Sequence, residues 1–183
     1  LVCVFFSAGL CGPLYARGKA YPLIAEVEYF SIYAYPGMYV QDLLEKINFD
    51  SFFQVDGLNT VMDSPRDITA KTFDAVYLEV SDAIGISAYS FTGKIKIFPN
   101  QKELSDEFRA LFGRDFPERA FYLHEKKTLY FSHEDIHIGM LVHEMAHIAM
   151  SNYFVIPPSP KLQEILSGYV EYHFRRRLNM PLK

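Results

Sequence analysis

The spacing of hydrophobic and polar residues predicts five helices. In four segments apolar residues recur every three or four positions and so share one side of a helix, whereas a fifth is apolar on nearly every side, as expected of a buried central helix. The four are residues 40–47, 65–84, 101–112 and 161–177, and the fifth is residues 138–150. Ser64 and Pro65 supply a capping side chain and a first-turn proline for the second helix, and Gly113 ends the third.

Runs of β-branched and aromatic residues predict five strands. They are residues 26–34, 88–91, 94–98, 119–124 and 128–131. Thr92-Gly93 and Glu125-Lys126-Lys127 each lie between two of these runs, so each pair of runs is expected to form a hairpin. The order of elements is typical of an α+β fold with a small, mostly antiparallel sheet packed against helices. Residues 48–63 give no clear prediction.

The composition indicates one globular domain. Half of the 183 residues are hydrophobic, which is enough for a sizeable core. The formal charge is −4 and the charges are interspersed, so there is no basic stripe of the kind that binds nucleic acid. The one basic run, Arg175-Arg176-Arg177, is expected to solvate the end of a helix and complement its dipole. We therefore expect residues 21–183 to form one domain without a nucleic-acid partner.

The first twenty residues differ from the rest of the chain. Residues 1–16 carry no charge and have the length and texture of the apolar part of a secretory signal peptide. Both cysteines, Cys3 and Cys11, lie in this segment, so the remaining domain would contain no disulfide. We therefore expect residues 1–20 to be a signal-peptide remnant or membrane-targeting segment of an exported protein. This segment is the only part of the chain that we expect to contact a membrane. The alternative is a buried strand or helix of the domain itself.

The fifth helix contains the sequence His143-Glu144-Met145-Ala146-His147, which matches the pattern H-E-x-x-H. Two histidines four residues apart lie on one side of a helix, one turn from each other, so both imidazoles can reach a single metal ion. Glu144 projects about 100° away from His143 and would stand beside the metal, within reach of a bound water. The alternative is a chance match, in which both histidines are core residues bonded to backbone carbonyl groups.

A catalytic zinc ion usually has three protein ligands, so a third ligand is expected after His147. The candidates are Glu164, Glu171 and His173. A proline-rich turn at residues 157–160 precedes the last helix and would bring its first turn, with Glu164, back toward the metal. Residues 164, 168 and 171 share one side of that helix, and Gly168 would allow it to approach the H-E-x-x-H helix closely.

The H-E-M-A-H sequence, together with P-K-L-Q-E-I-L-S-G-Y-V-E-Y at residues 160–172, resembles the gluzincin class of zinc metallopeptidases, and in particular the bacterial peptidase-MA-like group. The resemblance implies a zincin-like fold and a Zn²⁺ ion held by His143, His147 and Glu164. It also places Tyr169 at a tyrosine position of that group. Many gluzincins have an aspartate four residues after the glutamate ligand, where this chain has Gly168. Glu171 could replace it by accepting the proton of a ligand imidazole.

These observations predict zinc-dependent hydrolysis of a peptide or protein substrate, with Glu144 as the general base. Tyr169 and Tyr153 are candidates for stabilising the oxyanion of the transition state. Strand 128–131 is expected to form a sheet edge that can pair with an extended peptide. The alternative function is a non-catalytic zincin-like binding domain with a structural metal or none. The remaining histidines are expected to be surface or hydrogen-bonded residues; they are His124, His133, His137 and His173.

Overall fold

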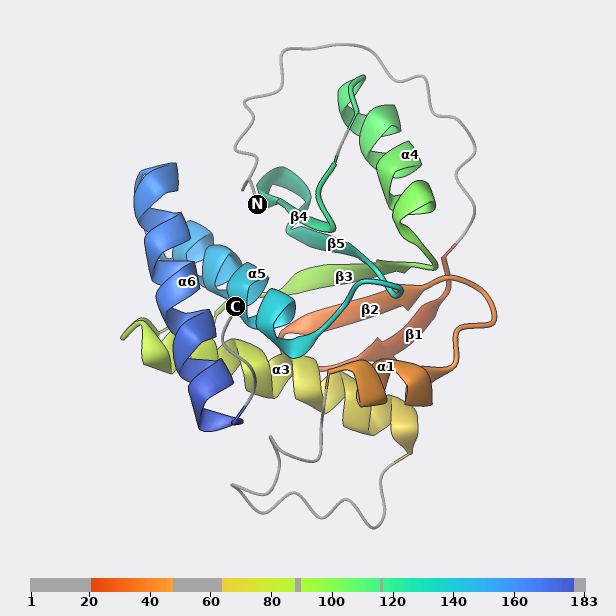
Figure 1. Ribbon diagram of the computed structural model, residues 1–183, viewed down its shortest axis with the longest axis horizontal. Coiled ribbons are helices and arrows are strands. Elements are labelled where there is room, and N and C mark those ends of the chain that lie inside the picture. Colours follow the sequence, from red (N-terminus) through yellow and green to blue (C-terminus); the bar gives the residue numbers. More distant parts are fainter. Residues whose placement is uncertain (1–20, 48–63, 88–89, 116, 180–183) are drawn as a thin grey trace.

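The computed structural model describes residues 21–47, 64–87, 90–115 and 117–179, which form an α+β fold around a five-stranded mixed sheet (Figure 1). The strands are β1 (Leu23–Glu26), β2 (Phe30–Ala34), β3 (Gly93–Phe98), β4 (Ala120–Leu123) and β5 (Thr128–Ser132). The helices are α1 (Val40–Lys46), α3 (Pro65–Ala83), α4 (Gln101–Phe112), α5 (Ile138–Tyr153) and α6 (Pro160–Arg177). The predictions for residues 1–20 and 48–63 lie outside the described residues.

All five predicted helices are confirmed. The residues that start and end them could be read from the sequence because they act on backbone groups only a few positions away. Ser64 and Asp67 form a reciprocal capping box at the start of α3, in which each side chain accepts a hydrogen bond from the other residue's backbone N–H. Gly113 ends α4 in the left-handed conformation, with φ of 68°. Within the described ranges, none of the helices combines the length and the apolar character that crossing a bilayer requires.

The sheet has the strand order β1-β2-β3-β5-β4, and the prediction that it is mostly antiparallel is wrong. The two outer pairings are antiparallel, whereas β3 is parallel to both β2 and β5. The reason is that the chain returns to the starting end of the sheet before β3 and again before β5. Helices α1 and α3 lie between β2 and β3, and the antiparallel strand β4 comes directly before β5 in this sheet.

The strand predicted for residues 26–34 is confirmed only over residues 30–34, which form β2; residue 26 ends a separate strand, β1, and residues 27–29 form a tight turn between the two. The backbone N–H groups of Glu28 and Tyr29 donate hydrogen bonds to the carboxylate of Asp74 on α3, with the shortest N···O distances at 2.9 and 3.2 Å. A helix side chain therefore fixes this turn, and no residue pattern within the strand itself signals it.

The hairpin predicted at Thr92-Gly93 is also wrong, because β3 already pairs with β2 on one side and β5 on the other. Gly93 is needed for close packing. A Cβ atom at this position would lie 2.8 Å from Cε1 of Phe91, whose ring packs against those of Phe30 and Tyr77. Residues 88 and 89 of the predicted partner strand lie outside the described residues.

The second predicted hairpin is confirmed as β4 and β5, but β5 is not the sheet edge. It pairs with β3 as well, so among the described strands β4 is the edge on this side of the sheet, and β1 is the edge on the other side. The prediction was wrong only about which strand of the hairpin pairs with the rest of the sheet. Both strands are fully buried, so the sequence alone does not distinguish them.

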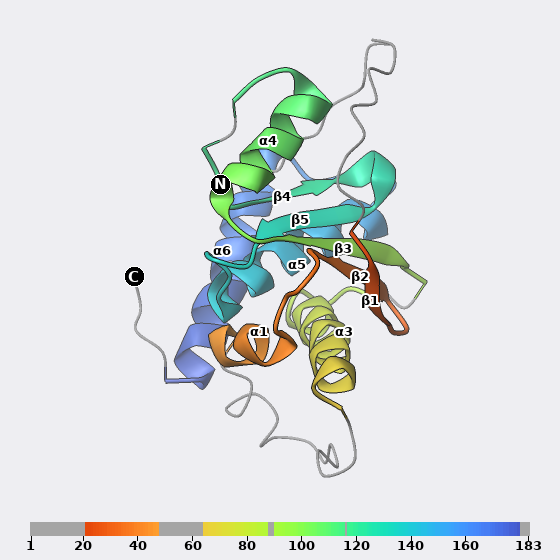
Figure 2. The ribbon, with the colours of Figure 1, turned by 90° about the vertical axis from the view of Figure 1, so that its right-hand side faces the viewer.

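Alternate residues of the central strands point to two hydrophobic clusters. One face of the sheet packs on α3 and α5 through residues such as Ile32, Ile95 and Leu129, and the other packs on α4 through Phe98 and Tyr130. Figures 1 and 2 show α6 on the outer side of α5, away from the sheet. Helix α5 is thus enclosed between the sheet and α6, and the chemistry it carries lies at its contact with α6.

Candidate metal centre

His143 and His147 come from the middle of α5 and turn their rings toward each other. Their Nε2 atoms are 3.2 Å apart, as expected for two residues one helical turn apart on the same side. His147 has no exposed surface, and the side chain of His143 is 12% exposed. The helix begins at a cap formed by His137, whose ring accepts a hydrogen bond from the backbone N–H of Met140. His137 therefore has a structural role outside the pair.

Glu164 from the first turn of α6 completes a group of three. Its Oε2 lies 3.4 Å from Nε2 of His143 and its Oε1 lies 3.3 Å from Nε2 of His147. Ser159 caps α6 and Pro160 begins it, which fixes the turn that carries Glu164 back to α5. The ligand atoms of His143, His147 and Glu164 all lie within 4.8 Å of one another, so the three side chains that the sequence singled out do converge.

The ligand atoms of this group are suited to a metal ion. Zinc binds imidazole nitrogen and carboxylate oxygen at about 2.0–2.2 Å, and two ligands of a tetrahedron at that radius are about 3.3–3.6 Å apart. Here the two Nε2 atoms are 3.2 Å apart, and those of His143 and His147 lie 3.4 and 3.3 Å from different oxygens of Glu164. Two imidazoles and a carboxylate are also the donor types that zinc accepts. The residues present therefore fit such an ion in the chemistry of their ligand atoms, and they lie close enough together to hold one metal ion.

Glu144 is buried beside the group and lacks a complete set of hydrogen bonds. It is 3% exposed, and its Oε1 has no hydrogen-bond partner among the described residues. Burial raises the pKa of this carboxyl group to about 7, against a smaller lowering by the charge of His143. A buried carboxylate oxygen without a partner is costly, so this position calls for a proton donor that the surrounding side chains do not supply.

Glu171 lies behind His143, as the sequence suggested. Its Oε2 is 3.3 Å from Nδ1 of His143, the ring nitrogen that faces away from Glu164. Its other oxygen, Oε1, accepts a hydrogen bond of 2.8 Å from Nε of Arg175. Arg175 is 8% exposed, so the expectation that all three arginines at 175–177 are solvated is wrong for this residue. The spacing of four between Glu171 and Arg175 was the signal for their pairing.

Gln163 supports His147 in the same way, and sequence reasoning missed it. This fully buried side chain places Oε1 3.3 Å from Nδ1 of His147, and its Nε2 donates a hydrogen bond of 2.9 Å to the carbonyl of Pro158. A polar residue beside Glu164 in the first turn was the available signal. Each imidazole of the pair therefore has an acceptor behind it that can fix which ring nitrogen faces the group.

The two imidazoles have pKa values shifted in opposite directions. Burial lowers the pKa of His143, but its hydrogen bond with Glu171 and the nearby carboxylates outweigh this, so the net shift is upward. Burial and the charge of His143 lower the pKa of His147. Because the two Nε2 atoms are 3.2 Å apart, a proton on one ring opposes a proton on the other. His147 is thus favoured as a neutral imidazole, the form that binds metals.

Helices α5 and α6 approach each other closely at Gly139, and not at Gly168 as the sequence suggested. A Cβ atom at Gly139 would lie 2.8 Å from Oε1 of Glu171 and 2.9 Å from Cζ of Arg175, whereas one at Gly168 would meet nothing within 4 Å. Gly139 lies one turn before His143, on the same side of α5. It therefore makes room for the acid–base pair that supports that histidine.

Tyr169 and His173 lie outside the three-residue group. Tyr169 is 54% exposed, and its ring packs against that of the exposed His173 with centroids 4.3 Å apart. Tyr153 is 48% exposed and packs on Phe154. Among the described residues, no contact brings either tyrosine to the group, so their oxyanion role stays a prediction.

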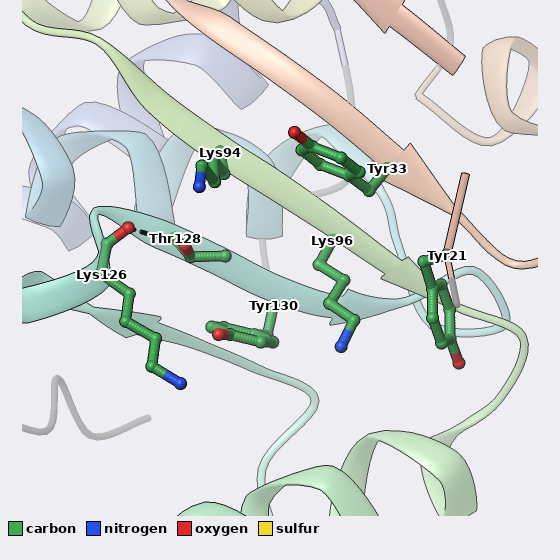
Figure 3. Close-up of a pocket in the computed structure, with 7 residues that line it drawn as sticks. All are labelled: Tyr21, Tyr33, Lys94, Lys96, Lys126, Thr128 and Tyr130. Carbon is green, nitrogen blue, oxygen red and sulfur yellow. Dashed lines mark hydrogen bonds between the residues drawn. The ribbon is translucent and has the colours of Figure 1, made fainter. Parts of the chain in front are cut away.

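A separate hollow of about 400 Å³ lies over strands β2, β3 and β5 (Figure 3). Its lining residues are Tyr21, Tyr33, Lys94, Lys96, Lys126, Thr128 and Tyr130. Lys96 forms an ion pair of 2.7 Å with Glu107 of α4 and lies over the ring of Tyr21. The hollow is thus on the α4 side of the sheet, and none of its lining residues belongs to α5 or α6.

A comparison of the chain with protein-family models, curated proteins and solved structures found no match.

Proposed function

We propose that this protein is a zinc-dependent peptide hydrolase of the gluzincin type, acting outside the bacterial cytoplasm. The observation that carries the proposal is the convergence of His143, His147 and Glu164, whose ligand atoms all lie within 4.8 Å of one another and are of the types that zinc accepts. Two of these residues belong to an H-E-x-x-H sequence on a buried helix, and the third comes from the next helix. An accidental H-E-x-x-H match would not require this convergence.

Each side chain of the site would have a separate role in the hydrolysis of a peptide bond. A bound zinc ion would lower the pKa of a water molecule and polarise a peptide carbonyl group. His143, His147 and Glu164 would hold the ion. Glu144 would take the proton from the attacking water and deliver it to the departing amine, a task that suits a carboxyl group whose pKa is about 7. Glu171 and Gln163 would keep the two imidazoles in the required orientation.

The sheet edge next to the site supports a peptide as the substrate. Strand β4 is one of the two edge strands among those described, and α5 packs against it. The side-chain amide of Asn152 on α5 donates a hydrogen bond of 2.9 Å to the hydroxyl of Tyr122 on β4. An extended peptide bound along β4 would run beside the helix that carries two of the metal ligands.

A non-catalytic metal-binding domain is the second candidate. Structural zinc sites usually have four protein ligands, whereas catalytic sites have three and keep one position open. The group contains three such residues in the described part of the chain. The unpartnered oxygen of Glu144 also favours catalysis, because a purely structural site has no use for a buried carboxylate beside the metal ligands.

Substitution of the general base tests the proposal. With zinc supplied, we expect the wild type to cleave members of a broad peptide library, and Glu144→Gln to bind zinc equally well but to cleave about 10²–10⁴-fold more slowly. Glu125→Gln, at an exposed position between β4 and β5, is the control and should retain full activity. Zinc binding without cleavage by the wild type would favour the binding domain. Equal cleavage by the wild type and Glu144→Gln would refute the assigned mechanism.

A further inference from the structure

Exposed hydrophobic side chains are concentrated in one region. Ten large hydrophobic side chains are exposed in the described residues, and eight of them belong to the last residue of α5, the loop after it or α6. They are Tyr153, Phe154, Val155, Ile156, Leu162, Ile165, Tyr169 and Tyr172. We call these eight residues the outer apolar face. Single exposed hydrophobic residues are normal, but such a concentration indicates a surface that binds a partner or a membrane.

Four residues of this face form a stripe along α6. Leu162, Ile165, Tyr169 and Tyr172 follow one another at intervals of three, four and three residues, so they lie on one side of the helix. They are between 45% and 58% exposed. The opposite side of α6, with Val170 fully buried, packs on α5. Helix α6 is therefore apolar on two sides, and one of them faces away from the domain (Figures 1 and 2).

The loop between α5 and α6 extends the stripe with two protruding aliphatic side chains. Val155 is 100% exposed and Ile156 is 86% exposed. Pro157 and Pro158 follow immediately and restrict the backbone, so the loop presents these side chains at little cost in conformational entropy. Because they are so exposed, these two consecutive aliphatic side chains make little contact with the rest of the domain. The loop thus has the form of a small apolar wedge at one end of the stripe.

Basic residues stand at both ends of the stripe. Lys161 precedes it, and Arg176 follows Tyr172 by four residues on the same side of α6; both are exposed. The acidic residues of α6, Glu164 and Glu171, face α5. If a second copy packed on this stripe, each basic end would meet a basic end, in either helix orientation. This repulsion disfavours a dimer, whereas anionic headgroups above an apolar layer complement both features.

We propose that the outer apolar face lies on the surface of an anionic lipid bilayer, with Val155 and Ile156 inserted below the headgroups. The three tyrosines, Tyr153, Tyr169 and Tyr172, would lie at headgroup level, where an aromatic ring with a hydroxyl group is favoured. Lys161 and Arg176 would contact the anionic lipids. The proposal does not depend on metal binding or hydrolysis, and it adds a membrane contact that is independent of residues 1–20.

The absence of tryptophan from the chain allows a direct test with the full 183 residues. Val155→Trp and Tyr39→Trp each introduce a single tryptophan at an exposed site, and Tyr39, which is 76% exposed and precedes α1, serves as the control. On mixing with vesicles of phosphatidylcholine and phosphatidylserine, the fluorescence of Val155→Trp should shift to shorter wavelength and be quenched by brominated lipid. That of Tyr39→Trp should not change, even if residues 1–20 attach the protein to the vesicle.

Charge and loop variants complete the test. Lys161→Gln and Arg176→Gln should each weaken binding of Val155→Trp to these vesicles about fivefold. Ile156→Ser, added to Val155→Trp, should weaken it at least tenfold. Circular dichroism checks that each variant is folded, which the exposure of these positions favours. Equal shifts for Val155→Trp and Tyr39→Trp, or no shift for Val155→Trp, would overturn the proposal. A dimer that Ile165→Ser dissociates would assign the face to a second copy.

Discussion

Helices α3 and α5 pack against each other on the same face of the sheet, and both bury polar side chains. On α3 these are Thr69, Thr72 and Ser81. Each hydroxyl group donates a hydrogen bond of 2.7–2.8 Å to the backbone carbonyl four residues earlier in the same helix. These three hydroxyl groups are therefore satisfied within the helix and need no partner beyond its own backbone.

On α5 the buried polar groups are not satisfied in this way. Glu144 keeps an oxygen without a partner, and Nε2 of His147 faces Nε2 of His143 and a carboxylate oxygen of Glu164. An imidazole pair and a carboxylate in contact have few protons to share among several acceptors. The difference between the two helices shows that burial of polar residues alone does not indicate function. Function is indicated when buried hydrogen-bond acceptors lack donors and are directed at one point.

The largest effect that we expect from the difference between α3 and α5 is a gain in stability when Glu144 is replaced. In zinc-free protein at about pH 8, Glu144→Met should raise the free energy of unfolding by about 1–4 kcal/mol, because a buried charge without full compensation is exchanged for an apolar side chain of similar size. Urea unfolding measures this. The control is Thr72→Val on α3, which should cost no more than about 1 kcal/mol. Destabilisation by Glu144→Met would mean that Glu144 contributes to the fold as the α3 hydroxyls do.

A smaller effect is expected from the residue behind His143. Glu171→Gln should weaken zinc binding about 10–100-fold, because a neutral amide orients and polarises the imidazole less well than a carboxylate. Competition with a fluorescent zinc chelator measures the affinity. Glu79→Gln is the matched control, since Glu79 also forms an ion pair with an arginine of α6 but lies outside the three-residue group and its supports. Equal affinities for the two variants would remove Glu171 from the site.

The smallest effect concerns Asp74, a titrating group of α3 whose carboxylate accepts hydrogen bonds from backbone N–H groups. Burial raises its pKa to about 6, although the N–H groups of Tyr29 and Glu28 oppose the shift. A carboxyl group whose pKa is higher in the folded state contributes stability that is present below its unfolded pKa of 3.8 and is lost as pH rises through about 6. Since Asp74 is partly solvated, the contribution should be no more than about 1 kcal/mol. Asp74→Asn should flatten urea-derived stability between about pH 4 and 7, and an unchanged slope would contradict the assignment.

The helices could be predicted from the sequence because the information lies within a few residues. The capping box of Ser64 and Asp67 and the glycine after α4 act over one turn. The placement of His143, Glu144 and His147 around one point also follows from helical geometry alone. These features do not depend on how the rest of the chain folds.

The sheet could not be predicted to the same extent, because strand pairing joins residues far apart in the chain. The segment that forms β3 alternates in the same way whether it lies at an edge or in the centre, and Gly93 at its start suggested a turn. The need for glycine there comes from the ring of Phe91, which is a packing constraint. The turn that separates β1 from β2 likewise depends on a side chain of α3.

The supports of the candidate site show the same limit. Gln163, Arg175 and Gly139 matter because α5 and α6 cross where they do, and the crossing is a property of the whole fold. Glu164 came from the resemblance to a family together with its position after the proline-rich turn. Residues one step removed from the reacting atoms are thus the ones that sequence reasoning misses, because they act through other side chains.

The most direct test of the central claim is the zinc content of the purified chain after equilibrium dialysis against buffered zinc. The wild type should retain about one zinc ion per chain, as three converging ligands require. His147→Ala and Glu164→Ala should retain almost none while remaining folded, and Ser81→Ala, which removes a hydroxyl that is satisfied within α3, should retain as much as the wild type. A wild type without zinc, or ligand variants that hold as much as the wild type, would contradict the account.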